Sequence, residues 1–199
     1  MATDTYKTIK AAGEGLYKEK GSRFIAFAYP VASADEVKAL VDAKKKEYHD
    51  ARHVCYAYRI NPAKIEFRGN DDGEPSGTAG RPMLGCLQSQ DLVNVLLVVV
   101  RYFGGIKLGT SGLINAYKVA SEDALLHCEV EERTIDAIFN IQFDYLYLND
   151  VMRITKDMKP AILSQSFDLG CKMTLQIRMQ QAEALRERLE KVQTLKIED

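Results

Sequence analysis

The sequence predicts an α+β protein of two domains, an N-terminal α/β sandwich over residues 1–130 and a C-terminal ferredoxin-like βαββαβ domain over residues 131–199. An unbroken, β-branched apolar run at residues 95–100 indicates a strand that is covered on both faces at the centre of a sheet. A charge cluster at residues 129–133 then interrupts the hydrophobic pattern. Beyond the cluster, the patterns follow the order β-α-β-β-α-β, which is typical of the ferredoxin-like fold.

The composition limits the classes of function. The chain has 199 residues, 46% hydrophobic and 28% charged, as expected of an ordinary globular protein. Residues 1–130 carry 17 Lys and Arg against 16 Asp and Glu, and residues 131–199 carry 10 against 12. Neither part therefore has a general basic field for nucleic acid, and any contact with RNA or phosphate must come from a local patch.

The cysteines and the apolar segments indicate a cytoplasmic protein. The sequence holds no C-x-x-C pair, which argues against a zinc site or a disulfide framework and favours reduced core residues; the four cysteines are Cys55, Cys86, Cys128 and Cys171. No N-terminal targeting signal and no stretch of 18 apolar residues is present. We therefore expect a cytoplasmic location and no membrane partner.

The first 68 residues predict short strands and one helix. Residues 5–20, broken by two glycines, indicate short strands at a sheet edge, and residues 24–31 indicate a firmer strand. Ser33 and Glu36 form a capping box in which the serine bonds forward and the glutamate bonds back. The helix that follows buries Val37, Leu40, Val41 and Tyr48. We interpret the lysines at residues 44–46 as a solvated helix end, and residues 53–60 and 65–68 as a hairpin.

His53 and Cys55 lie two apart on the predicted strand and so face the same side, as a base and a nucleophile do in some enzymes. No orienting carboxylate can be identified for either residue, and packing is the commoner reason for such a pair. We assign no catalytic residue, and enzymatic activity is not expected from this sequence alone.

A first glycine-rich loop covers residues 69–82, GNDDGEPSGTAGRP, and nearly lacks hydrophobic residues. Asp71, Asp72 and Glu74 offer oxygen ligands to a divalent cation, although the spacing of a full calcium loop is absent. The alternative is a polar turn without metal. Fourteen residues without periodicity in a compact domain favour a functional loop, and residues 83–87 indicate a short helix after it.

A second glycine-rich loop covers residues 103–112 and follows the central strand. A helix comes next, with Thr110 or Ser111 expected as its N-cap. Strand, glycine loop and helix N-terminus together form an arrangement that binds anions. The phosphate loop of nucleotide hydrolases matches only in part, because Thr110 and Ser111 stand where that motif requires Lys and then Ser or Thr. A tight turn that only serves packing is the alternative.

The C-terminal domain is predicted from five segments. Residues 135–143 indicate a strand, and residues 145–157 a helix with Leu146, Val151, Ile154 and Met158 inward and Pro160 as its stop. Residues 161–167 and 171–179 form a hairpin around Asp168, Leu169 and Gly170. Residues 182–192 indicate an amphipathic helix, and residues 194–197 a last strand.

Three motifs resemble those of the IMPACT family in its bacterial form. They are Arg52-His53 ahead of a strand, DDGEPSGTAGRP at residues 71–82 and VVRYFGGIKLG at residues 99–109. The resemblance is sharpest over residues 21–124, and the two-domain plan covers the whole chain. It implies an N-terminal domain similar to one of a ribosomal small-subunit protein and a C-terminal domain similar to one of elongation factor G, and both point towards translation.

The leading hypothesis is a cytosolic, translation-linked regulator that binds RNA or a ribosomal surface through the two loops, which we expect to meet on one face. Arg81, Arg101 and Lys107 would contact phosphates, and Gly104, Gly105 and Ser111 would donate backbone N–H groups. Tyr102 and Phe103 would stack on bases if they are exposed, and packing in the core is the alternative for aromatic residues beside a central strand. One alternative is a metal-dependent enzyme for a small phosphorylated or nucleotide substrate, with a divalent cation on Asp71, Asp72 and Glu74. The other is a protein-interaction module with a protein partner.

Overall fold

A computed structural model of the chain describes residues 4–167 and 170–198. The chain divides into two compact units. One unit is Tyr6–Arg133, and the described part of the other comprises residues 4–5, 134–167 and 170–198. In the described ranges no helix is both long and apolar enough to span a bilayer.

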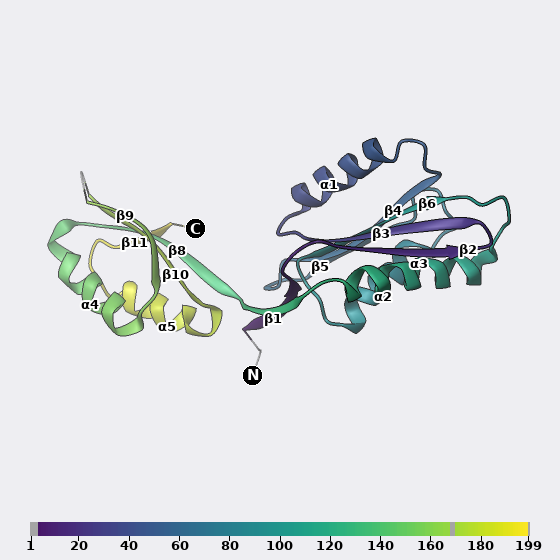
Figure 1. Cartoon of the computed structure of the whole chain (residues 1–199). Helices are drawn as coiled ribbons and strands as arrows, with labels where there is room; N and C mark the ends of the chain where they lie inside the picture. Colours follow the sequence, from purple (N-terminus) through teal and green to yellow (C-terminus); the bar gives the residue numbers. More distant parts are fainter. Residues whose placement is uncertain (1–3, 168–169, 199) are drawn as a thin grey trace. The chain divides into compact units, whose positions relative to one another are not determined.

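The N-terminal unit is built on a five-stranded sheet in which every neighbouring pair is antiparallel. In sheet order the strands are β2 (Gly13–Glu19), β3 (Ser22–Pro30), β6 (Val95–Tyr102), β4 (His53–Ile60) and β5 (Glu66–Asn70). The prediction that the apolar run is the central strand is confirmed: β6 is buried from Val95 to Arg101. An unbroken apolar pattern is usual in parallel sheets, whose faces are both covered. Here the strands are antiparallel, but helices also cover both faces of the sheet (Figure 1).

Helix α1 (Ala34–Glu47) covers one face of this sheet, and helices α2 (Gly80–Ser89) and α3 (Gly109–Leu126) cover the other (Figure 1). Each face has its own hydrophobic core. At the start of α1 the Ser33 hydroxyl accepts a hydrogen bond from the Glu36 N–H at 3.3 Å, as predicted. The Glu36 carboxylate bonds back to the N–H of Ala32 at 2.8 Å, one residue before the expected Ser33.

Two of the three lysines at the end of α1 are not simply solvated, which corrects the sequence interpretation. Lys44 Nζ lies 3.8 Å from the centroid of the Phe27 ring and 2.8 Å from Glu47 Oε2. Lys45 Nζ lies 2.7 Å from Asp72 Oδ1, in the first glycine-rich loop. Lys44 thus connects α1 to the sheet, and Lys45 connects it to that loop.

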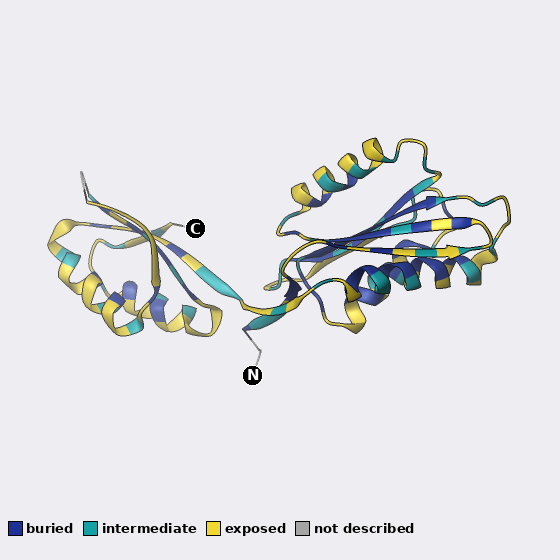
Figure 2. Ribbon diagram, viewed as in Figure 1, coloured by how far each residue is buried: buried dark blue, intermediate teal, exposed yellow. Residues whose placement is uncertain are grey.

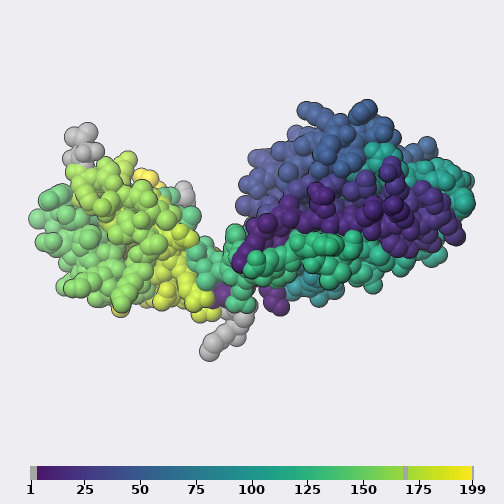
Figure 3. Space-filling view, viewed as in Figure 1, coloured from purple at the N-terminus to yellow at the C-terminus, as the bar shows by residue number. Residues whose placement is uncertain are grey.

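Helix α3 covers edge strand β2 along its length (Figure 3). The Leu16 N–H donates to Asp123 Oδ2 at 2.8 Å, which uses a backbone donor that an open edge would expose. Glycine is required at position 15, because a Cβ there would lie 2.3 Å from the Ala124 nitrogen. The first strand, β1 (Thr5–Ile9), pairs instead with β7 (Val130–Thr134) in a two-stranded sheet.

The C-terminal unit has the predicted ferredoxin-like order. Its antiparallel sheet runs β11 (Lys196–Glu198), β8 (Asp136–Phe143), β10 (Cys171–Arg178) and β9 (Ala161–Ser166). The short 3-10 helix η1 (Tyr145–Tyr147) and the helices α4 (Leu148–Met158) and α5 (Met179–Leu189) pack on one face. Buried residues alternate with exposed ones along β8 and β10, so the other face is open to solvent (Figure 2).

Some details of this unit differ from the sequence prediction. Leu146 is 81% exposed rather than inward, because it falls in η1, before the amphipathic part of α4 begins. Helix α4 ends through a left-handed residue, Lys159 (φ 53°), ahead of Pro160. Helix α5 begins at Met179, three residues earlier than expected. In the predicted hairpin turn, Asp168 and Leu169 lie outside the described residues.

Candidate functional site

The first glycine-rich loop is shorter than predicted, because Gly69 and Asn70 belong to β5 and Gly80 begins α2. Asp71 organises the remaining residues, 71–79. Its Oδ1 accepts the N–H groups of Ala79 at 3.0 Å and Gly80 at 2.8 Å, and its Oδ2 accepts that of Gly77 at 2.8 Å. Burial opposes ionisation of Asp71, but these three donors outweigh it and lower the pKa of the carboxyl group. Asp71 therefore caps α2 from a distance.

Asp72 fixes the loop to strand β4. Its Oδ2 accepts the Val54 N–H at 2.7 Å, and its backbone carbonyl lies 2.7 Å from His53 Nδ1. A carbonyl oxygen can only accept, so His53 donates from Nδ1. In the neutral ring, Nε2 is then the unprotonated nitrogen. Partial burial of Asp72 opposes ionisation, but Lys45 and the Val54 N–H lower the pKa of its carboxyl group.

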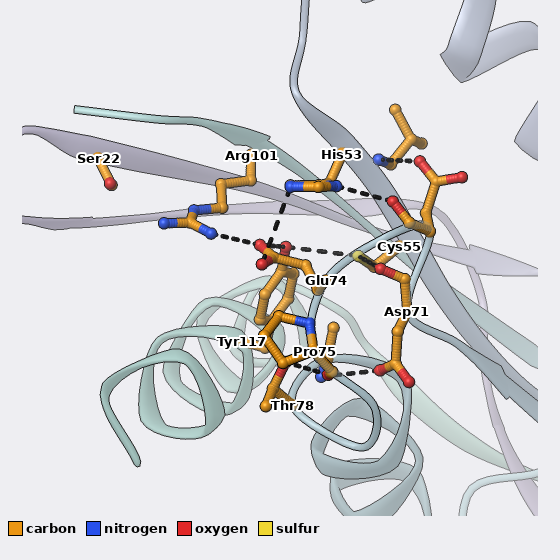
Figure 4. A network of polar contacts seen from close by, with 12 residues as sticks. Ser22, His53, Cys55, Asp71, Glu74, Pro75, Thr78, Arg101 and Tyr117 are labelled. Atoms are coloured by element: carbon orange, nitrogen blue, oxygen red, sulfur yellow. Dashed lines mark hydrogen bonds and ion pairs between the residues drawn. The ribbon is translucent and has the colours of Figure 1, made fainter. Parts of the chain in front are cut away.

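Glu74 lies at the centre of a buried polar network (Figure 4). Its Oε1 accepts hydrogen bonds from Arg101 Nη1 at 2.5 Å and from the Tyr117 hydroxyl at 2.8 Å. Its Oε2 lies 3.8 Å from His53 Nε2. The side chains of Glu74 and Arg101 are 3% and 7% exposed. His53 thus has a nearby carboxylate after all, which the sequence could not identify because Glu74 is 21 residues away.

Cys55 shares a face of β4 with His53, as predicted, and lies beneath this network. Its Sγ donates to the Asp71 carbonyl at 3.0 Å and lies 3.4 Å from the Tyr117 hydroxyl. Burial strongly raises the pKa of the Cys55 thiol, and it also raises that of the Tyr117 hydroxyl. Both groups are therefore protonated at neutral pH, and Cys55 lacks the thiolate that a nucleophile needs.

The three acidic side chains proposed as metal ligands point to separate partners. Asp71 binds the start of α2, Asp72 binds β4 and Lys45, and Glu74 binds Arg101 and Tyr117. Across residues 4–167 and 170–198, no group of three His, Cys, Asp or Glu side chains is placed to hold a metal ion. This geometry does not fit a divalent cation shared by the three carboxylates.

Helix α3 begins at Gly109 with Leu108 at its N-cap position, and no side chain caps it. The expectation of an N-cap at Thr110 or Ser111 is therefore wrong, because both lie within the first turn. That turn also contains no acidic residue. Gly105 (φ 90°) and Gly109 (φ 73°) supply the left-handed backbone that carries the chain into the helix. The positive end of the helix dipole is thus left without a side-chain acceptor.

Gly104 serves packing rather than binding. A Cβ at this position would lie 1.9 Å from the backbone carbon of Gly21, in the turn between β2 and β3. Its N–H donates to the Ser22 hydroxyl at 3.1 Å and so is not free for a ligand. This close approach holds the second loop against the sheet.

The two loops meet at a cavity of about 430 Å³, as the sequence predicted. The first loop contributes Glu74 and Pro75, and the second contributes residues of the segment from Phe103 to Thr110. The other lining residues are Arg52, His53, Arg101 and Leu113. Arg52 and Lys107 are exposed, and their side chains have no ion-pair partner in the described part of the chain.

The cavity contains some of the predicted ligand-binding residues and not others. Arg101 and Lys107 line it, whereas Arg81 lies exposed on α2 outside the lining, and Gly104, Gly105 and Ser111 are not part of it either. Arg101 is held by Glu74 instead of reaching solvent.

The two aromatic residues proposed to stack on bases lie in different places. Phe103 lines the cavity and is 47% exposed, whereas the Tyr102 hydroxyl donates to Asp50 at 2.8 Å and its ring packs with the α1 core. The sequence interpretation missed Arg52 and His53 as lining residues. Their place in one of the three motifs was the available signal.

The fold and the cavity define a two-domain α+β protein with a small site on its N-terminal unit that combines an apolar wall with cationic side chains. The chain belongs to the IMPACT family: residues 20–125 match the Impact N-terminal domain. IMPACT family member YvyE of Bacillus subtilis is 42% identical over 147 residues, which is 74% of this chain and 68% of the relative. YigZ of Escherichia coli is 35% identical over 150 residues, 74% of each chain.

One solved structure shows the same fold over nearly the whole chain. A crystal structure described as that of a hypothetical protein matches 98% of this chain and 97% of its own, with a TM-score of 0.74 and 27% sequence identity. The two-domain translational regulator Yih1 matches 60% of this chain and 48% of its own, with a TM-score of 0.40 and 27% identity.

Proposed function

We propose that this chain is a cytosolic, translation-linked regulatory protein that binds single-stranded RNA, with one unpaired nucleotide in the cavity between the glycine-rich loops. Three features converge on one cavity and support this proposal: two cations without ion-pair partners among the described residues, an uncapped helix N-terminus and an exposed aromatic ring.

The phosphate group is assigned to the rim of the cavity. Arg52 and Lys107 are exposed there without ion-pair partners in the described ranges, and Gly109 and Thr110 present the start of α3. An anion gains from both the cations and the helix dipole. Arg101 has a different role from the one predicted, because its charge is matched by Glu74 in the interior. It positions Glu74 instead of competing for the phosphate.

The base is assigned to the apolar wall. Phe103 is about half exposed, and Leu108 and Leu113 line the cavity beside it. Stacking of a base on an aromatic ring contributes roughly 1–3 kcal/mol and tolerates any base. The volume of about 430 Å³ is in the range of small-ligand pockets. It suits a single unpaired nucleotide and not a duplex.

The connection to translation is an expectation from the family to which the chain belongs. Yih1, which shares 27% identity with the matched 60% of this chain, is a translational regulator. Ribosomal RNA offers many unpaired nucleotides and is therefore one source of the ligand in this proposal.

Fluorescence anisotropy with labelled single-stranded RNA at about 50 mM and about 200 mM salt tests the proposal. The test variant is Arg52→Ala/Lys107→Ala, and the matched control is Arg81→Ala, which removes an exposed cation outside the cavity. Arg101 is unsuitable because its loss would strand a buried carboxylate.

If two phosphate contacts are lost, the slope of log K against log salt becomes less negative by about 1.4 in the double variant. The control should bind as the wild type does. No binding by the wild type, or equal losses in the double variant and the control, would overturn the proposal.

A free small phosphorylated or nucleotide ligand is the second candidate, and the cavity volume of about 430 Å³ favours it. Thermal shifts with nucleoside monophosphates, measured without metal, separate the two candidates. A shift that disappears in Arg52→Ala/Lys107→Ala, together with no affinity for RNA, would support the small ligand. If no nucleoside monophosphate shifts the melting temperature, the small-ligand candidate is excluded.

A further inference from the structure

We propose that Glu74 and His53 form a subsite for the 2′-hydroxyl of a ribose, so that the cavity accepts ribonucleotides in preference to deoxyribonucleotides. This inference rests on the proposed binding of single-stranded RNA and adds the feature of the ligand that is recognised.

The two oxygens of the Glu74 carboxylate have different surroundings. Oε1 accepts hydrogen bonds from Arg101 and Tyr117, whereas Oε2 has no hydrogen-bond donor within the described ranges. The fully buried side-chain oxygen and nitrogen atoms without a hydrogen-bond partner in those ranges are Arg101 Nε and Asp4 Oδ2, the latter in an ion pair with Arg178. Glu74 Oε2 is not among them, so this oxygen keeps a small exposed area beside the cavity that Glu74 lines, although the side chain as a whole is only 3% exposed. A strong acceptor is therefore available at the cavity floor.

His53 directs a second polar atom to the same place. Its Nδ1 is held by the Asp72 carbonyl at 2.7 Å, which leaves Nε2 facing Glu74 Oε2 across 3.8 Å. This gap is too long for a direct hydrogen bond. An oxygen atom beside the gap can reach both atoms at ordinary hydrogen-bond lengths.

A hydroxyl group suits this position when His53 is protonated, because it can then donate to one side of the gap and accept from the other. It donates its proton to the Glu74 carboxylate, and its oxygen accepts from Nε2–H when the imidazole is protonated. A phosphate is disfavoured by the carboxylate, and the adjacent Arg101 disfavours a cation. With the phosphate at the Arg52 and Lys107 rim, the hydroxyl of the attached sugar is the donor that enters with the nucleotide. The 2′-hydroxyl is the group by which a protein distinguishes RNA from DNA.

A deoxyribose would leave Glu74 Oε2 dehydrated and without a donor. The expected loss of affinity is about 10- to 100-fold, the value for a missing hydrogen bond to a charged group. A 2′-fluoro sugar is the sharper probe, because fluorine is similar in size to a hydroxyl but cannot donate.

The experiment measures the affinity of the full-length protein for three single-stranded oligonucleotides of one sequence, with 2′-hydroxyl, 2′-deoxy or 2′-fluoro sugars. The wild type should bind the 2′-hydroxyl form at least about tenfold more tightly than either of the others. His53→Gln and Glu74→Gln should reduce this preference for the 2′-hydroxyl form, while Arg81→Ala leaves the preference unchanged. The wild-type comparison stands even if a variant fails to fold.

Binding of the 2′-fluoro form as tightly as the 2′-hydroxyl form would overturn this inference while leaving RNA binding intact. A preference for ribose that persists unchanged in folded His53→Gln and Glu74→Gln would overturn the assignment of these two residues. Failure of the wild type to bind any of the oligonucleotides would overturn the proposed function and this inference with it.

Discussion

Removal of the Glu74 side chain should destabilise the N-terminal unit strongly, because it strands the Arg101 guanidinium in the interior. The two side chains are 3% and 7% exposed, so neither charge is well hydrated. Breaking such a pair from one side costs about 3–5 kcal/mol. In Glu74→Ala the Tyr117 hydroxyl also loses its acceptor, which costs about 1 kcal/mol more. We expect a total loss of about 4–6 kcal/mol in the free energy of unfolding.

Urea unfolding followed by tyrosine fluorescence measures this loss in the full chain. The sequence has no tryptophan, and eight of its ten tyrosines lie in Tyr6–Arg133, so the signal reports mainly on that unit. With a slope of about 2 kcal/mol per M urea, the midpoint should fall by roughly 2–3 M. The transition of each unit must be fitted separately, because two-unit chains need not unfold in one step.

The matched control is the double variant Glu74→Leu/Arg101→Met, which removes both charges and keeps the volume. It should be more stable than Glu74→Ala, because no buried charge is left unpaired. The reasoning is refuted if Glu74→Ala costs less than about 1 kcal/mol, the value for a solvated surface pair. The reasoning is also refuted if the double variant loses as much free energy of unfolding as the single variants Glu74→Leu and Arg101→Met lose together.

Three further predictions concern the segments that shape the site. Asp71→Asn should reduce the loss of folding stability on acidification. Because the pKa of Asp71 is lowered in the folded protein, its stabilising contribution is complete above the ordinary carboxyl pKa and disappears as pH falls through the folded value. Denaturation of the variant and the wild type at about pH 3 and about pH 6 measures this difference. Gly104→Ala should lower the free energy of unfolding by about 1–3 kcal/mol or more, because the added methyl group overpacks the β2–β3 turn. The control Gly85→Ala, in open space on α2, should raise it by about 0.5–1 kcal/mol. Thermal melts that rank the two variants the other way would contradict the packing role of Gly104. Lys44→Ala should cost about 0.5–2 kcal/mol through the lost contact with three aromatic rings, while Lys46→Ala, an exposed neighbour, should change unfolding by less than about 0.5 kcal/mol.

Local patterns were sufficient for much of the fold. The apolar run of β6 reports burial on both faces, and that information is contained within the strand itself. The order of elements in the C-terminal unit follows from alternating and helical periodicities, and the ferredoxin-like sheet confirms it. The meeting of the two glycine-rich loops was also predicted, because each departs from the periodicity around it.

The roles of individual charges could not be predicted in the same way. Arg101 looked available to a ligand, yet its partner Glu74 lies 27 residues away in sequence and buries it. The three acidic residues looked like one cluster, but the turn at Asp72 sends them to different elements. Long-range contacts, which no local pattern records, decide whether a charged side chain holds the fold together or stays free for a ligand.

Photo-crosslinking tests the central claim, that one unpaired nucleotide occupies the cavity, most directly. The full chain would be irradiated with single-stranded RNA that carries a photoreactive uridine, and crosslinked peptides would be mapped by mass spectrometry. We predict crosslinks in the segment that contains Phe103 and Lys107, with loss of these crosslinks in Arg52→Ala/Lys107→Ala. Crosslinks confined to the C-terminal unit, or unchanged in the double variant, would contradict the account.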